Sequence, residues 1–306
     1  MAPYGILAEV RSPLVVHPVV LAVLAIVSVQ FGNALAGSFF SEVGPLGAAA
    51  LRLGLAAVIL LVAVRPRVRG WDARTWVGVG MLGLGLAGMN LLIYQAIASI
   101  PLGVAVTIEL LGPLGVAVAG TRRWRDLGWV ALAALGIVGL WLSGGEGEGS
   151  LALAGVLAAL GAAVFWALYI VASARLGPRA RGVDGLAMAM LVAAIIVVPF
   201  GAAPASAAVA VEPLLLLVFA GIAVMTSAVP YALEFIALKR MPTRVFGVLS
   251  SLGPAVAALA GLLVLGQTLD VLQLAAIAAV VVACAGAVAT APRPPLIAAE
   301  AAPPVE

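Results

Sequence analysis

Long apolar runs separated by short polar segments make up almost the whole chain. A helix that crosses the hydrocarbon core of a bilayer needs about 20 mostly apolar residues, within roughly 17–25. By that length the sequence predicts ten membrane-spanning helices and an all-α integral membrane protein. The expected spans are 16–38, 45–64, 76–98, 101–120, 126–143, 150–172, 185–201, 213–237, 244–265 and 270–290. Residues 1–15 form a polar lead, and the proline-rich segment 291–306 is expected to be a disordered tail.

The basic residues predict the orientation of these spans, because short cytoplasmic loops of membrane proteins carry an excess of Lys and Arg. If the N-terminus is inside, the inner segments hold all of the chain's 16 basic residues except Arg52, which lies within a span. The charged residues of the outer loops are all acidic, among them Glu42, Glu146 and Asp270. Both termini are therefore expected in the cytoplasm, with the protein in a bacterial plasma membrane. A cleavable signal peptide is the alternative for the N-terminus, but this apolar run exceeds the usual 7–15 residues and contains Gln30 and Asn33.

Composition narrows the class of protein further. Hydrophobic residues make up 64% and charged residues 9% of the chain, whereas soluble domains carry about 25% charged residues. The net charge of +3 is divided among short clusters, so no nucleic-acid partner is expected. One cysteine, one histidine and the lack of an enzyme motif predict a protein that is not an enzyme and has no cofactor and no metal. His17 could relay protons, but a structural role at the membrane interface is favoured. The sequence predicts no oligomeric state.

The chain also contains an internal repeat. The segment PLGVAVTIELLGPLGVAVAG, at 101–120, matches PTRVFGVLSSLGPAVAALAG, at 242–261, at eight of 20 positions. These segments are the fourth and ninth spans, so the repeating unit is five helices, and the odd number turns the second copy upside down. Two inverted repeats, 16–143 and 150–290, are thus expected, an architecture that recurs in secondary transporters with the substrate site near the repeat interface. Shared small-residue composition is the alternative explanation.

Ionisable residues inside spans are costly and are functional candidates by default. Arg52 and Glu109 fall at similar depth, roughly 10 and 12 Å from the outer ends of their spans at about 1.5 Å per residue. They either face the substrate path, suited to the carboxylate and ammonium of a zwitterion or to a coupled proton, or they simply neutralise each other. Glu234 is expected to pair with Lys239 and Arg240 at the inner interface. The candidate substrate- or ion-binding residues of the first half are Arg52, Glu109, Asn90, Gln30, Asn33 and Tyr94.

In the second half, the polar residues are expected in the inner half of the bilayer, including Thr226, Ser227 and Ser251. The candidate binding residues there are Trp166, Tyr169, Tyr231 and Ser250, although Trp and Tyr also form membrane-interface belts. Prolines within spans remove a backbone donor and bend the helix. Pro113 and Pro254, each after a glycine, therefore predict two bent helices that act as gates. The glycines Gly78, Gly80, Gly83, Gly85 and Gly88 predict close helix packing.

These features resemble the EamA branch of the drug/metabolite transporter superfamily. Within that family, GMNLLIYQAI (88–97), PLGVAVTIELLGPLGVAV (101–118), VPYALEFIAL (229–238) and PTRVFGVLSSLGPA (242–255) look similar to the bacterial inner-membrane exporters of threonine and homoserine. The resemblance implies a ten-helix bundle, efflux of small neutral amino acids and proton antiport. Its motif positions include Arg52, Asn90, Glu109, Pro113, Tyr231, Glu234 and Pro254.

Two positions depart from the pattern of that family. Gly253 and Gln267 stand where many relatives carry glutamate, so substrate or stoichiometry could differ here. The sequence thus predicts a proton-coupled exporter of threonine- or homoserine-like amino acids that works by alternating access. Efflux of another metabolite or drug by the same fold remains an alternative, as does a channel or membrane sensor. A channel would not need bent helices or internal symmetry.

Overall fold

The computed structural model describes residues 17–119, 126–143, 152–176, 183–238, 241 and 243–290. In these ranges all regular secondary structure is helical. The helices are α1 (Pro18–Gly37), α2 (Phe40–Val64), α3 (Ala73–Ile97), α4 (Leu102–Glu109), α5 (Leu111–Ala119), α6 (Asp126–Ser143), α7 (Leu153–Leu176), α8 (Asp184–Val211), α9 (Leu215–Ala223), the π-helix η1 (Val224–Ala228), α10 (Val229–Leu238), α11 (Thr243–Ser250), α12 (Gly253–Leu265) and α13 (Val271–Thr290). The expected lead at 1–15 and tail at 291–306 lie outside the described residues.

The helices agree closely with the spans expected from the sequence. In the described part of the chain, eight helical segments are long and apolar enough to cross a membrane, and 127–140 and 215–228 form two shorter apolar helices. The protein is therefore an all-α, multi-pass membrane protein. The largest boundary error concerns the seventh span, expected at 185–201 but extending as α8 to Val211. Its helix continues through Pro199 and Pro204, since the alanine-rich sequence after them remains apolar and membrane helices tolerate proline.

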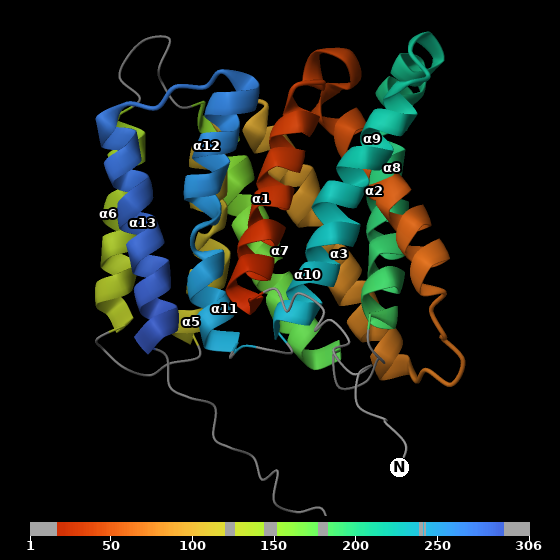
Figure 1. Cartoon of the computed structure of the whole chain (residues 1–306), viewed down its shortest axis with the longest axis horizontal. Helices are drawn as coiled ribbons and strands as arrows, with labels where there is room; N and C mark the ends of the chain where they lie inside the picture. The colour runs from red at the N-terminus through yellow and green to blue at the C-terminus, as the bar shows by residue number, and fades with distance from the viewer. Residues whose placement is uncertain are drawn as a thin grey trace, which may run out of the picture.

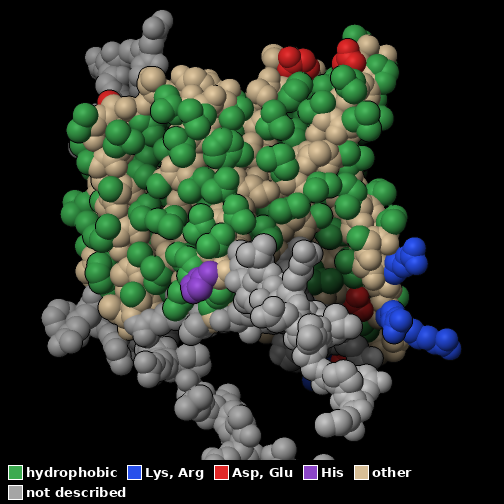
Figure 2. Space-filling view, in the orientation of Figure 1, with side chains coloured by type: hydrophobic (Ala, Val, Ile, Leu, Met, Phe, Trp, Pro, Cys, Tyr) green, Lys and Arg blue, Asp and Glu red, His purple; other side chains and the backbone are tan. Residues whose placement is uncertain are grey.

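The surface has the polarity of a protein immersed in lipid. Figure 2 shows a broad apolar belt, with acidic side chains along its upper edge and basic side chains near its lower edge. Leucines and valines on several helices are exposed within it, for example Val62 at 64%, Leu217 at 70% and Val282 at 54%. In water this much contiguous apolar surface would drive association, whereas in a bilayer it is the favourable contact surface.

Local hydrogen bonds fix several helix ends. The Nδ1 atom of His17 accepts from the backbone N–H of Val19 at 3.3 Å and caps α1, which agrees with the structural role favoured for this histidine. The carboxylate of Asp72 caps α3 by accepting from the backbone N–H of Thr75 at 2.8 Å. Gln267 reaches the other half of the chain, where its Oε1 accepts from the backbone N–H of Leu102 at 2.9 Å and caps α4. One of the two departures from the family pattern therefore holds a helix start in place.

Both helices predicted to bend are broken, which confirms that prediction. The fourth span divides at Leu110 into α4 and α5, and the ninth divides at 251–252 into α11 and α12. Each break lies just before a proline, Pro113 or Pro254, whose missing N–H leaves the carbonyl four residues earlier without its helical partner. A third proline, Pro230, lies two residues after the end of the π-helix η1, and such π segments occur frequently at functional sites.

Close helix packing explains some of the glycines in α3, but not all. A Cβ atom at Gly85 would lie 2.9 Å from the backbone N of Tyr169, and one at Gly88 would clash with the ring of Phe165. These glycines let α3 lie directly against α7. The expectation was wrong for Gly80, because a Cβ there would meet nothing within 4 Å.

This difference gives a matched pair of substitutions. Gly85→Ala is expected to lower stability by about 1–3 kcal/mol, because the added methyl group meets backbone that cannot move without separating the helices. Gly80→Ala, a control on the same helix with open space, should leave stability unchanged or slightly raised. Thermal unfolding of the purified proteins in detergent measures both, and equal melting temperatures would contradict the packing of α3 on α7.

The helices form one bundle in which residues far apart in sequence lie side by side (Figure 1). The most extensive packing joins α2 to α8, α3 to α7 and α6 to α13. Helix α1 lies between the halves and contacts η1, α10, α11 and α12. This arrangement brings α1 and α2 of the first half against η1 at the centre of the bundle.

Candidate functional site

Arg52 lies in the middle of α2 with only 7% of its surface exposed. Its Nε donates to Oγ1 of Thr226 at 2.8 Å. Its Nη1 donates to the hydroxyl of Tyr94 at 3.1 Å and to Oδ1 of Asn33 at 3.3 Å. We call these four residues the Arg52 cluster. All three acceptors are neutral, so the cluster holds a positive charge inside the bundle without cancelling it.

Four helices supply the cluster, and small residues let them approach. The side chain of Ser28 on α1 donates to the carbonyl of Met225 at 2.6 Å and joins α1 to η1. A Cβ atom at Gly32 would lie 2.5 Å from Cγ2 of Thr226, so glycine is needed where the two segments meet. Thr226 also donates its hydroxyl to the carbonyl of Ile222 at 2.7 Å, which turns its oxygen lone pairs toward Arg52.

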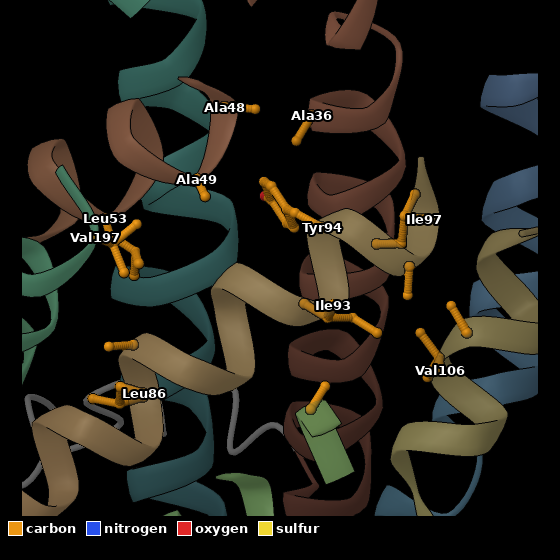
Figure 3. Close-up of a cluster of buried hydrophobic side chains, with 14 of the residues drawn as sticks. Ala36, Ala48, Ala49, Leu53, Leu86, Ile93, Tyr94, Ile97, Val106 and Val197 are labelled. Atoms are coloured by element: carbon orange, nitrogen blue, oxygen red, sulfur yellow. The ribbon is translucent and has the colours of Figure 1, made fainter. Parts of the chain in front are cut away.

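Tyr94 of α3 is fully buried and is surrounded by apolar residues. In Figure 3 its side chain lies beside Ala36 of α1 and Ala48 and Ala49 of α2. The ring centroid is 5.6 Å from that of Phe40 and 5.3 Å from Cζ of Arg52. Alanines at these positions make room for the ring, and the packed ring in turn fixes the hydroxyl that accepts from Arg52.

The guanidinium retains hydrogen-bonding capacity. Arginine has five N–H donors, and the three on Nε and Nη1 are used within the cluster. Among the described residues, no acceptor is found for the two N–H groups of Nη2. Arg52 is thus held rigidly on one side and can bind an acceptor, such as a carboxylate, on the other.

Gln30 and Asn90 extend the polar region by one helical turn. Gln30 precedes Asn33 by three residues on α1, so both side chains share a face, and both are buried. Asn90 precedes Tyr94 by four residues on α3, and its Nδ2 donates to the carbonyl of Leu86 at 2.7 Å. Both residues were expected at the level of Arg52, and the structure places them next to members of the Arg52 cluster.

Glu109 is the last residue of α4 and is 8% exposed. Its carboxyl group and the Arg52 charge interact electrostatically. However, these two described side chains do not form a direct ion pair, and the guanidinium bonds to hydroxyls and an amide instead. Mutual neutralisation by contact, one of the two alternatives raised by the sequence, is therefore not the arrangement observed. A buried carboxyl group and a buried guanidinium lie near each other without a direct ion pair.

The second-half candidates are more dispersed. Tyr169 of α7 lies near Ser173, which is four residues later on the same helix, and near Glu234 of α10. Trp166 packs against the apolar cluster formed by α5, α6 and α13, and Ser250 donates to the carbonyl of Phe246 at 3.0 Å. The side chain of Tyr231 lies outside the described residues, as do Lys239 and Arg240, the expected partners of Glu234.

Thr226 is the residue that the sequence misplaced. Counting residues along its span put Thr226 in the inner half of the bilayer and Arg52 in the outer half, yet the two are hydrogen-bonded. Both lie near the middle of their spans, where a depth estimate does not separate the halves. The signal that could have found this contact is Pro230, because the π-helix before it changes which face Thr226 presents.

An open cavity lies elsewhere. It has a volume of about 350 Å³, lies between α3 and α7, and is lined by Ala73, Arg74, Val77, Gly78, Met81, Ala172 and Arg175. Its lining residues are at the end of the bundle where α2 ends and α3 begins. None of them belongs to the Arg52 cluster, so the buried Arg52 cluster and this open cavity are separate features of the bundle.

Fold and site together define a multi-pass α-helical membrane protein with a charged cluster inside its bundle. A model of the EamA-like transporter family matches residues 153–289. The threonine/homoserine exporters RhtA of Salmonella typhimurium (strain LT2) and Escherichia coli (strain K12) are each 41% identical to this chain. The alignments cover 92% and 89% of the chain and 94% and 92% of those proteins. The chain belongs to the EamA-like transporter family.

A solved crystal structure supports the fold. It has a TM-score of 0.57 and 24% sequence identity, and the match covers 89% of this chain and 95% of that chain. At this identity the similarity concerns the arrangement of helices and does not extend to the substrate.

Proposed function

We propose that this protein exports small amino acids of the threonine and homoserine type across the bacterial plasma membrane, by alternating access. The observation that carries the proposal is a buried arginine with two N–H donors unused by the described residues, near a buried carboxyl group with which it is not paired. Relatives with 41% identity over most of the chain are named threonine/homoserine exporters, which supports the same substrate class.

The two charges match the two ends of an amino acid. The Nη2 donors of Arg52 would bind the carboxylate, since guanidinium and carboxylate groups form strong, oriented hydrogen bonds. The carboxylate of Glu109 would bind the ammonium group. Without substrate, Glu109 would instead take up a proton, because an unpaired charge in the bundle is costly. Alternate binding of proton and substrate at one carboxyl group would couple export to proton entry.

Two inverted five-helix repeats, 16–143 and 150–290, are part of this proposal, and the packing of the helices supports them. Exchanging the halves pairs α3 with the α9–α10 span and α1 with α7. Under that exchange the packing of α3 on α7 corresponds to that of α10 on α1, and both contacts are extensive. The packing of α2 on α8 and of α6 on α13 maps onto itself. Such a pseudo-symmetric bundle can adopt two equivalent arrangements, one open to each side.

The helix breaks before Pro113 and Pro254 would act as gates. They lie at matching repeat positions, and Pro113 leaves the carbonyl of Glu109 without its helical donor, so the first break adjoins the proposed ammonium site. Pro254→Ala, which restores an N–H, is expected to straighten the ninth span and slow efflux about tenfold or more while threonine binding persists. Initial efflux rates and equilibrium binding in detergent measure the two quantities. A variant with reduced binding and unchanged turnover would contradict a gating role.

The orientation with both termini in the cytoplasm is supported by the charge distribution. Arg65, Arg67, Arg69 and Arg74 lie between α2 and α3, and Glu42, Glu212 and Asp270 lie near the opposite helix ends. This agrees with the excess of basic residues in cytoplasmic loops. Accessibility of single cysteines introduced at 68 and 212 to an impermeant reagent on whole cells tests it, with only the second position expected to react.

Export of labelled amino acids from bacterial cells that lack their own exporters tests the function. Cells that express the protein should release threonine and homoserine faster than cells with an empty vector, and should tolerate higher external concentrations of both. Release of a different metabolite or of a cationic drug would instead support the alternative substrate within the same fold. Release that runs equally in both directions and ignores the proton gradient would indicate a channel.

A further inference from the structure

Gln30 carries a polar atom that the protein leaves unused. Its side chain is 8% exposed, and its Oε1 is buried without a hydrogen-bond partner among the described residues. Burying an amide oxygen unpaired costs free energy, so such atoms are uncommon and call for an explanation. Ser227, next to Thr226, has the same property at its Oγ. The two residues lie on α1 and η1, the segments joined by the bond from Ser28 to Met225.

The unused amide lies beside the proposed substrate site. Gln30 is one turn from Asn33 on the same face of α1, and Asn33 accepts from Arg52. On its other side, the Nε2 of Gln30 is 3.7 Å from where a Cβ atom at Gly253 would stand. Gly253 begins α12, directly after the break in the ninth span. The amide therefore lies between the Arg52 cluster and a predicted gate.

Polar partners elsewhere in the site do not satisfy Gln30. Asn90 bonds to its own helix, Asn33 is engaged by Arg52, and Thr226 is engaged by both Arg52 and the carbonyl of Ile222. What the amide lacks is a group that can donate to Oε1. A substrate hydroxyl supplies such a donor, and its oxygen can also accept from an amide N–H. A methyl group of the same size can do neither.

We propose that Gln30 determines specificity by binding the side-chain hydroxyl of the substrate, so that the site selects hydroxyl amino acids over their apolar isosteres. The inference rests on the proposed function, because it places the substrate's carboxylate on Arg52. Its physical basis is that a polar site rejects an apolar analogue more strongly than an apolar site rejects a polar one. A site built to bond a hydroxyl leaves its own polar group unpaired when an apolar analogue binds, and it rejects that analogue more strongly than a merely apolar site could.

The experiment uses purified full-length protein in proteoliposomes and measures how unlabelled amino acids compete with counterflow of labelled threonine. Valine replaces the hydroxyl of threonine by a methyl group, and 2-aminobutyrate removes the hydroxyl. The wild type should prefer threonine over valine by at least about tenfold. Gln30→Leu, which keeps the volume but removes the amide, should reduce that ratio to near one, mainly through weaker threonine transport. Valine transport should be retained.

Thr107→Val is the matched control. Thr107 is fully buried on α4, and its hydroxyl donates to the carbonyl of Gly103 on the same helix at 2.6 Å. The change removes a buried polar group without touching Gln30, and it should leave the threonine-to-valine ratio as in the wild type.

The possible results test the role of Gln30 in specificity separately from amino-acid export itself. A wild type that transports threonine and valine equally overturns the inference without any variant. An unchanged ratio in Gln30→Leu does the same, and both results leave amino-acid export intact. A wild type that transports no amino acid overturns the proposed function itself.

Discussion

Arg52→Lys is expected to reduce threonine efflux about a hundredfold, although the charge is kept. The guanidinium bonds simultaneously to Thr226, Tyr94 and Asn33 on three segments. A lysine ammonium is a compact charge that lacks the planar fork needed to hold these partners and a carboxylate together. Each charged hydrogen bond is worth about 1.5–3 kcal/mol, so the loss of even one or two explains this magnitude. The measurement is the initial efflux rate divided by the amount of protein in the membrane.

Arg69→Gln serves as the control for Arg52→Lys. Arg69 is exposed in the segment between α2 and α3, so its substitution removes a charge without affecting the cluster, and efflux should remain close to that of the wild type. Thermal unfolding of both variants separates a folding defect from a transport defect. Wild-type efflux by Arg52→Lys would show that the bonds of the guanidinium are dispensable and would remove Arg52 from the proposed substrate site.

Glu109→Gln is expected to reduce net efflux by about tenfold to a hundredfold. The change keeps the shape of the side chain but removes the negative charge that would bind the substrate ammonium, a charged hydrogen bond worth about 1.5–3 kcal/mol. Because Arg52 and Glu109 are not paired directly in the structure, the substitution should not disrupt the Arg52 cluster. The matched control is Glu42→Gln, an exposed carboxylate bonded to Ser41, for which unchanged efflux is expected.

Two assays on Glu109→Gln distinguish the roles assigned to this residue. If Glu109 binds the ammonium group, both net efflux and exchange of internal for external threonine fall. If it carries only the coupling proton, exchange continues while net efflux against a gradient is lost. Wild-type rates in both assays would contradict any role of Glu109 in transport.

The sequence predicted the spans well because the bilayer imposes one simple rule on length and polarity. Each expected span corresponds to a helix or to a helix broken near a proline, and the breaks before Pro113 and Pro254 follow directly from proline chemistry. Boundaries were less well predicted where the apolar sequence continues past a proline, as in α8. Helix length alone cannot show whether a terminal turn still lies in lipid.

The site was predicted in part. Arg52 was a predicted candidate, as were Asn33 and Tyr94, and the guanidinium of Arg52 donates to both of the others. The contact of Arg52 with Thr226 depends on how α2 and η1 pack, and these two residues are 174 positions apart in sequence. For the same reason the sequence did not decide whether Arg52 pairs with Glu109. The charge and the depth of a residue do not reveal which hydroxyl or amide groups accept hydrogen bonds from the guanidinium.

Counterflow of labelled threonine into proteoliposomes tests the central claim most directly, because it measures alternate exposure of a binding site without any driving gradient. Vesicles loaded with unlabelled threonine and containing the purified protein should accumulate the label transiently, and those containing Arg52→Lys should not. Absence of counterflow with the wild-type protein, or equal accumulation with both proteins, would contradict an Arg52-centred transport site.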